Sequence, residues 1–189
     1  MKNILLGVTG SIAAYKAAEI ARLLVKKNAS VRVIMTRSAQ RFITPLTFQT
    51  LTKRKVYTDM FEDAFYEDVR HIALAKEADI AVIAPATANI IGKLASGIAD
   101  DMLSSVIMAA AGGRPPKPVI VCPAMNTAMW ENSVVQGNIE KLKTLGYIFV
   151  EPAEAELACG DTGKGALASA DAIAGAALSQ PEKSAVPNG

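Results

Sequence analysis

The chain has 189 residues, of which 51% are hydrophobic and 20% charged, with a formal net charge of +2. This size and composition favour one compact domain with a substantial core. The balanced charge, with no basic stripe, argues against nucleic-acid binding. No apolar run is long enough to span a membrane, and no cleavable leader is recognisable, so we expect a cytoplasmic protein without a membrane partner.

Short β-branched runs alternate with segments of helix length. Residues 2–8 predict a buried strand, and residues 11–27 predict a helix because apolar side chains recur near the 3.6-residue period. Further strands are predicted over residues 30–36, 78–86, 117–124 and 147–152. Helices are predicted at roughly 70–78, 87–111 with a break near Gly97, and 127–145.

The strand runs are continuously apolar rather than alternating, which is typical of strands covered on both faces of a parallel sheet. The sequence therefore predicts an α/β fold: a doubly wound, mostly parallel sheet in a three-layer αβα, Rossmann-like domain. We expect this domain over residues 1–178. Residues 179–189 are polar and contain proline, which predicts a disordered tail or the stub of a linker.

Small polar residues follow four of the predicted strands. Because ligands of such folds bind at the carboxyl ends of the strands, these residues predict one shared cleft. They are Thr9, Gly10 and Ser11, then Thr36 and Ser38, then Thr87 and Asn89, and finally Asn126.

The segment "GVTGS" (7–11) opens a helix directly after a strand, where backbone N–H groups favour a phosphate. An ordinary βα turn containing glycine fits it equally well. The dinucleotide pattern G-x-G-x-x-G is absent, and no acidic residue ends the second strand to hold a ribose. A mononucleotide such as FMN fits better than NAD. "GDTGKG" (160–165) lacks the phosphate-loop spacing.

Four residues could carry chemistry, and each also has an ordinary structural interpretation. His71, the only histidine, could be a base or a solvated helix residue. Asn126 suits a helix N-cap as well as a substrate contact. Cys122 lies in an apolar strand and is expected in the core. Cys159 lies among glycines in "ELACGDTGKGALAS" (156–169), which predicts a mobile loop carrying a thiol.

Four motifs in this order closely resemble one family. They are "GVTGSIAAYK" (7–16), "VRHIALAKEADIAVIAPATANIIGKLASGIADDML" (69–103), "PAMNTAMW" (123–130) and "LACGDTGKGALA" (157–168). Together they resemble the homo-oligomeric flavin-containing cysteine decarboxylases, and within them the branch that acts on phosphopantothenoylcysteine in coenzyme A synthesis. The likeness covers nearly all of residues 2–178.

The resemblance implies roles for individual positions. It makes His71 the active-site base, Asn126 the group that holds the substrate carboxylate, and Cys159 a proton donor on a flap that covers the substrate. Substrate contacts are also implied for Glu156 and Ala158. FMN contacts are implied for Gly10, Ser11, Ile12, Thr36, Arg37, Ser38, Thr87, Ala88, Asn89, Ile90 and Ala124.

The resemblance also implies a reaction. Oxidised FMN takes a hydride from the carbon that bears sulfur, which gives a thioaldehyde whose C=S bond can accept the electron pair as CO₂ leaves. The resulting enethiolate is then reduced back by FMN and protonated by Cys159, which yields phosphopantetheine. The implied partners are the small-molecule substrate, further copies in a trimer or dodecamer, and a phosphopantothenate–cysteine ligase as a fused domain or a separate protein. No metal is implied.

One position departs from the family, because Leu167 stands where members often carry methionine. Three other functions remain to be distinguished. A peptidyl-cysteine decarboxylase stops at the enethiol and does not need the flap thiol. A flavin-binding regulatory subunit would keep the fold without catalysis. A flavin prenyltransferase shares the architecture but does not explain "PAMN" together with the flap thiol.

Overall fold

Parallel strands form the centre of the computed structural model, which describes residues 1–61, 70–156, 160 and 162–181. The strands of this sheet are β1 (Asn3–Val8), β2 (Ser30–Met35), β3 (Val56–Tyr57), β4 (Ile80–Ala86), β5 (Val119–Pro123) and β6 (Ile148–Phe149). Their order is β3-β2-β1-β4-β5-β6, and every neighbouring pair is parallel. The order reverses between β1 and β4, which is where doubly wound folds bind ligands.

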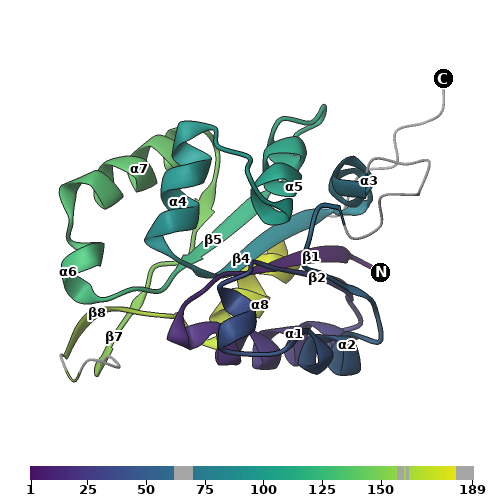
Figure 1. Ribbon diagram of the computed structural model, residues 1–189, viewed down its shortest axis with the longest axis horizontal. Coiled ribbons are helices and arrows are strands. Elements are labelled where there is room, and N and C mark those ends of the chain that lie inside the picture. The colour runs from purple at the N-terminus through teal and green to yellow at the C-terminus, as the bar shows by residue number, and fades with distance from the viewer. Residues whose placement is uncertain (62–69, 157–159, 161, 182–189) are drawn as a thin grey trace.

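Helices cover both faces of this sheet (Figure 1). One face packs against α1 (Lys16–Lys26), α2 (Pro45–Thr52) and α8 (Ala170–Ser179). The other packs against α3 (Arg70–Glu77), α4 (Ala88–Ser96), α5 (Met102–Ala111) and α7 (Ser133–Thr144). The predicted three-layer α/β fold is thereby confirmed. No helix of the described ranges is both long and apolar enough to cross a membrane.

Strand β1 shows why the strand runs are continuously apolar. Ile4, Leu6 and Val8 belong to the core on the α1 side, while Leu5 between them belongs to the core on the α5 side. Successive side chains of a strand point to opposite faces, so a strand covered on both faces needs an apolar residue at every position.

Several predicted boundaries were wrong. The predicted helix 11–27 begins as a 3-10 turn, η1 (Ile12–Tyr15), which Ser11 caps, and this turn continues directly into α1. The predicted helix 127–145 is divided into α6 (Thr127–Trp130) and α7, because Asn132 starts a new helix by accepting a hydrogen bond from Val134 N at 2.9 Å. The break near Gly97 is confirmed, since Gly97 ends α4 with φ +71°.

Some elements carried no prediction. A 3-10 turn, η2 (Ala39–Arg41), follows β2, and α2 and β3 come after it. The last helix of the described residues is α8, which ends at Ser179. The buried Lys2 side chain donates hydrogen bonds to Leu178 O at 2.8 Å and Ala177 O at 3.3 Å, so it satisfies carbonyls at the end of that helix. Of the predicted tail 179–189, residues from 182 onward lie outside the described part of the chain.

Asp101 stabilises the start of α5. Its carboxylate accepts a hydrogen bond from Ser104 N at 2.8 Å and pairs with Lys93 Nζ at 3.0 Å. Burial disfavours the charged form, but these hydrogen bonds and the Lys93 charge outweigh it and hold the pKa of Asp101 below its ordinary value. The stabilising contribution is therefore present above the unfolded-state pKa and is lost as the pH falls through the lower folded-state pKa.

Replacing Asp101 by alanine should lower the free energy of unfolding by about 1 kcal/mol near neutral pH, because a helix cap is lost. The difference between the two proteins should shrink below about pH 4, where the carboxyl of the native protein becomes protonated. Urea unfolding followed by circular dichroism over a pH series measures it. A stability difference that stays constant down to strongly acidic pH would contradict this role of the ionised carboxylate.

Candidate functional site

A cavity of about 530 Å³ opens at the carboxyl edge of the sheet. Its walls come from three segments: the turn after β1, the loop after β5, and a hairpin formed by β7 (Ala153–Glu156) and β8 (Thr162–Ala166). The lining residues are Ser11, Ile12, Ala13, Tyr15, Lys16, Ala124, Met125, Asn126, Glu156, Gly165, Ala166 and Leu167. The cleft predicted from the strand ends thus exists, although only two of the four predicted loops line it.

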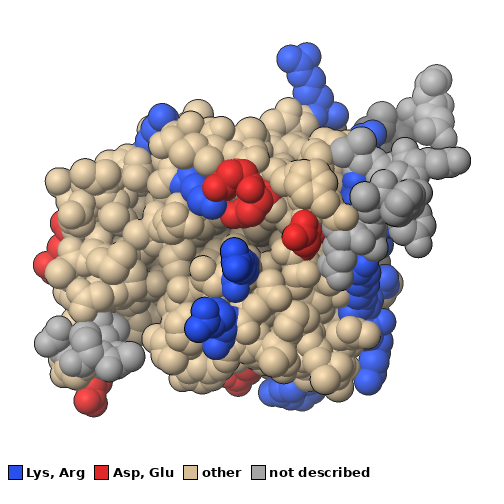
Figure 2. Space-filling view, in the orientation of Figure 1, with Lys and Arg blue, Asp and Glu red and all other residues tan. Residues whose placement is uncertain are grey.

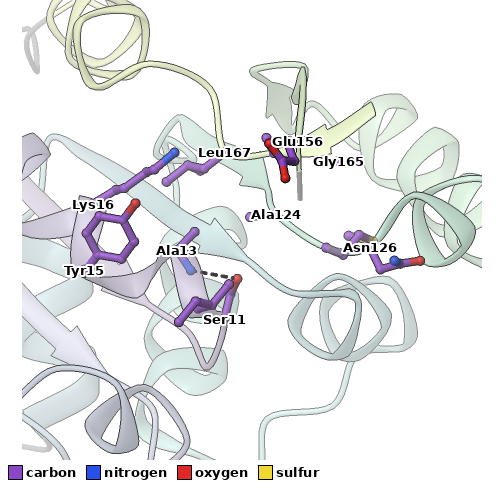
Figure 3. A pocket seen from close by; sticks show the side chains of 12 residues that line it. Ser11, Ala13, Tyr15, Lys16, Ala124, Asn126, Glu156, Gly165 and Leu167 are labelled. Atoms are coloured by element: carbon purple, nitrogen blue, oxygen red, sulfur yellow. Dashed lines mark hydrogen bonds between the residues drawn. The ribbon is translucent and has the colours of Figure 1, made fainter. Parts of the chain in front are cut away.

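The turn after β1 forms one wall. Ser11 caps η1 by accepting a hydrogen bond from Ala13 N at 3.2 Å, drawn as the dashed line in Figure 3. The tight turn carries the chain back, so that Tyr15 and Lys16 lie on the same side of the cavity (Figure 3). Sequence reasoning missed both residues. The available signal was a spacing of four residues, from Ser11 to Tyr15 and from Ile12 to Lys16, because residues four apart on a helix lie on the same face.

Asn126 lies on the opposite wall, in the loop after β5 (Figure 3). Its Oδ1 accepts a hydrogen bond from Ala128 N at 2.8 Å, so Asn126 is the N-cap of α6. The structural role and the substrate role are compatible, since the capping bond uses the carbonyl oxygen and the amide N–H groups are the donors suited to a carboxylate. Asn126 therefore lines the cavity with its backbone side, while the contact with Ala128 N holds its amide end toward α6, as Figure 3 shows.

The hairpin packs against this loop, and its glycines make the approach possible. Met125 N donates a hydrogen bond to Gly165 O at 3.0 Å. A Cβ on Gly165 would lie 2.2 Å from Met125 O, and one on Gly163 would lie 2.5 Å from Thr127 Oγ1. The loop predicted over residues 156–169 is wrong over Thr162–Ala166, which forms β8 and pairs antiparallel with β7. Gly163 and Gly165 therefore allow β8 to pack closely against the loop after β5.

The flap residues divide into two groups. Glu156, at the end of β7, and Leu167, just after β8, both line the cavity. Leu167 is 4% exposed and fills part of the cavity wall. Ala158 and Cys159 lie outside the described residues. Their predicted roles stay predictions.

The remaining predicted cofactor residues lie beside the cavity rather than in its lining. Gly10 approaches the loop after β2 so closely that a Cβ would lie 2.3 Å from Ser38 Cβ. Thr36 Oγ1 accepts a hydrogen bond from Ala39 N at 3.3 Å, while Arg37 is exposed. After β4, Thr87 caps α4, so Ala88, Asn89 and Ile90 form the first turn of that helix.

His71 is not brought to the cavity within this chain. It is the second residue of α3, half-buried, and does not belong to the cavity lining. Figure 1 shows α3 at the end of the sheet opposite the β7–β8 hairpin. One chain therefore does not bring together His71 and Asn126, which the sequence predicted to serve one site.

Cys122 lies within β5 and is fully buried. Burial raises the pKa of its thiol, so the reactive thiolate is suppressed. This confirms the predicted core position.

In a Cys159→Ser variant, Cys122 is the only thiol left, since the chain has two cysteines. We expect iodoacetamide to leave the native variant unmodified and to alkylate it fully in urea, because only unfolding exposes Cys122. Intact mass before and after treatment measures this. Alkylation of the native variant at the rate seen in urea would contradict the burial.

The lining suits a flavin mononucleotide, the cofactor that the sequence predicts. Ile12, Ala13, Ala124 and Leu167 supply apolar surface for a flat ring, and the volume falls within the range of about 300–1,000 Å³ typical of small-molecule sites. Hydroxyl groups suited to a phosphate stand beside the cavity on Ser11, Thr36, Ser38 and Thr87. The residues present therefore fit FMN.

Comparison with known proteins points in the same direction. A family model described as "Flavoprotein" matches residues 1–179. The bifunctional coenzyme A biosynthesis protein CoaBC of Bacillus subtilis (strain 168) is 50% identical over 166 residues, which are 88% of this chain and 40% of that protein. The chain thus spans less than half of this relative. A probable phosphopantothenoylcysteine decarboxylase of Streptococcus mutans is 47% identical, over 91% of this chain and 94% of that protein.

Solved structures agree in fold. A cysteine-to-serine mutant of a PPC decarboxylase, complexed with pantothenoylaminoethenethiol, superimposes with a TM-score of 0.84 at 33% identity, over 94% of this chain and 96% of the other. The FMN-binding protein AtHal3 gives a TM-score of 0.80 at 34% identity, over 94% and 95% of the two chains.

Proposed function

This chain belongs to the flavoprotein family, and from that premise we propose that it is an FMN-dependent phosphopantothenoylcysteine decarboxylase of coenzyme A biosynthesis. The reaction converts 4'-phosphopantothenoylcysteine into 4'-phosphopantetheine and CO₂. The observation that carries this assignment is the cavity in which the turn after β1, the Asn126 loop and the glycine-bearing hairpin meet. The decarboxylase domain is residues 1–178.

FMN is held at the carboxyl edge of the sheet. The turn at Gly10–Ile12, the loop at Thr36–Ser38 and the first turn of α4 at Thr87–Ile90 hold the cofactor, and Ala124 lies beside its ring. Helix starts and hydroxyl groups of this kind favour a phosphate. When bound, FMN would supply the redox capacity that the reaction needs, as a reversible acceptor of the hydride from the sulfur-bearing carbon of the substrate.

Asn126 orients the substrate carboxylate. Its amide N–H groups donate hydrogen bonds to the carboxylate without a full positive charge, which would stabilise the ionised substrate and oppose loss of CO₂. Because the Oδ1 of Asn126 is bound to Ala128 N, the side chain is held before the substrate arrives. Glu156 and Ala158 contact the substrate from the flap.

Cys159 is the acid that completes the reaction. It protonates the carbon next to the one that receives the hydride, so that the enethiolate becomes the saturated thiol. The adjoining strands β7 and β8 close over the cavity and exclude water during this step. A peptidyl-cysteine decarboxylase, whose product is the enethiol, has no use for such an acid.

His71 removes a proton from the substrate, and it reaches the cavity from another copy of the chain. The position of α3, away from the cavity of its own chain, supports this proposal (Figure 1). Figure 2 shows charged side chains spread over the face that it draws, with uncharged areas between them. Among the apolar side chains of the described residues, Ile98 and Met108 are exposed at 46% and 36%. Such apolar surface suits an interface between copies. The active form is a homo-oligomer, a trimer or a dodecamer of trimers.

The functional partner is a phosphopantothenate–cysteine ligase, as a fused domain or a separate protein, because such a ligase forms the substrate of this reaction and the named relatives include bifunctional proteins. The enzyme works in the cytoplasm, where reducing conditions keep substrate and protein thiols free.

A direct assay tests the function. Purified protein reconstituted with FMN is supplied with phosphopantothenoylcysteine or with a peptide that ends in cysteine, and the products are identified by mass spectrometry. We expect loss of CO₂ and formation of phosphopantetheine from the first substrate alone. An enethiol formed from the peptide would favour a peptidyl-cysteine decarboxylase, and FMN binding without any turnover would favour a regulatory subunit.

A further inference from the structure

Thr9 is a buried polar residue directly after β1 that does not line the cavity. It is 2% exposed. Its hydroxyl donates a hydrogen bond to Pro85 O at 2.7 Å and accepts one from Thr87 N at 3.1 Å. A single side chain therefore ties the loop after β1 to the turn between β4 and α4. These two strands are the neighbours between which the strand order reverses.

The segments on both sides of this link are the ones proposed to bind FMN. On one side, Ser11 N donates to Thr9 O at 2.9 Å, and Gly10 is packed against Ser38. On the other, Thr87 caps α4 and accepts a hydrogen bond from Ile90 N at 3.5 Å. The link continues beyond β4, since Ala124 N donates to Ala86 O at 3.0 Å.

We propose that Thr9 is a positioning residue for the cofactor: its hydroxyl holds the turn at Gly10–Ile12 and the start of α4 in the geometry that binds FMN. This inference rests on the proposed function. Thr9 acts without touching the cofactor, because its hydroxyl is already occupied by two backbone groups. Without that hydroxyl, Pro85 O and Thr87 N lose a buried partner and the two loops are free to separate. FMN binding must then include their reordering, which weakens affinity.

The chain offers a matched control for the loss of a buried threonine hydroxyl. Thr52 is 9% exposed, and its Oγ1 donates to Phe48 O at 2.8 Å inside α2, in a segment that does not line the cavity. Thr9→Val and Thr52→Val each remove one buried hydroxyl at nearly constant volume. Thr9→Ser keeps the hydroxyl and removes only a methyl group.

The measurement is titration of each apoprotein with FMN, followed by quenching of flavin fluorescence, at a temperature where circular dichroism shows every variant folded. We expect Thr9→Val to bind FMN about tenfold or more weakly than the wild type, because two buried hydrogen bonds that hold the binding loops are lost. Thr9→Ser should stay within about threefold, and Thr52→Val should keep wild-type affinity despite lower thermal stability.

Wild-type affinity in Thr9→Val would overturn the inference, as would equal weakening in Thr9→Val and Thr52→Val. If Thr9→Val does not fold, Thr9→Cys makes the same comparison, because a thiol is a much weaker donor of nearly the same size. It should bind FMN more weakly than Thr9→Ser, and equal affinities would overturn the inference. A wild-type protein that binds no FMN would instead contradict the proposed function.

Discussion

Replacing Cys159 by serine should separate the two halves of the reaction. CO₂ should still be released, while formation of phosphopantetheine falls by about 10²- to 10⁴-fold, the usual contribution of a positioned general acid. A serine hydroxyl is far less acidic than a thiol, whose ordinary pKa is about 8.5. The reaction should stop at the unsaturated thiol, with the hydride still on the flavin.

Anaerobic single-turnover experiments measure this directly. The variant should release one CO₂ for each bound FMN, and its flavin absorbance should remain bleached, whereas the wild-type flavin should become oxidised again. Cys122→Ala is the matched control, because it removes the other cysteine from the core and should leave the product unchanged. Phosphopantetheine formed by Cys159→Ser at the wild-type rate would refute the role of the thiol as acid.

Replacing His71 by asparagine should lower the turnover rate by about 10²- to 10⁴-fold, while FMN remains bound. The half-buried position of His71 on α3, outside the cavity lining, is the reason to expect an unchanged cofactor site.

Asn126→Asp should be inactive for a different reason. Aspartate keeps the N-cap of α6, but its negative charge repels the substrate carboxylate. Activity and flavin content of each purified variant measure these outcomes.

Mixing these two inactive variants tests whether the site is shared between copies. In a ring of mixed chains, an interface is intact when one chain supplies His71 and its neighbour supplies Asn126. Random mixing should therefore restore roughly a quarter of the wild-type activity, because ring interfaces are of the head-to-tail kind. Each variant refolded alone is the control. No recovery in mixed oligomers that copurify through differently tagged chains would show that His71 acts within its own chain.

The buried parallel strands could be predicted from the sequence because burial on both faces leaves a local signature. Every position of β4 is buried and is either apolar or proline. This run therefore predicts a buried strand without any knowledge of the strands beside it. The edge strand β3 could not be found in this way. It has two residues, Val56 and Tyr57, and only its pairing with β2 makes it a strand.

The hairpin and the cavity lining depend on contacts that local sequence does not display. Gly163 and Gly165 suggested a loop, but they are needed for close packing of β8 against the segment at Met125–Thr127. Asn126 could be assigned to the site from its motif. The structure shows that it caps α6 and lines the cavity. The distance of His71 from this cavity reflects the placement of α3, which a motif in sequence order does not reveal.

The most direct test of the account is whether the protein binds a flavin at all. Apoprotein is incubated with FMN, freed of excess ligand by gel filtration, and examined by absorbance. We expect one FMN per chain and a yellow protein that phosphopantothenoylcysteine bleaches transiently under anaerobic conditions. A folded protein that emerges colourless, even after incubation with excess FMN, would contradict the account.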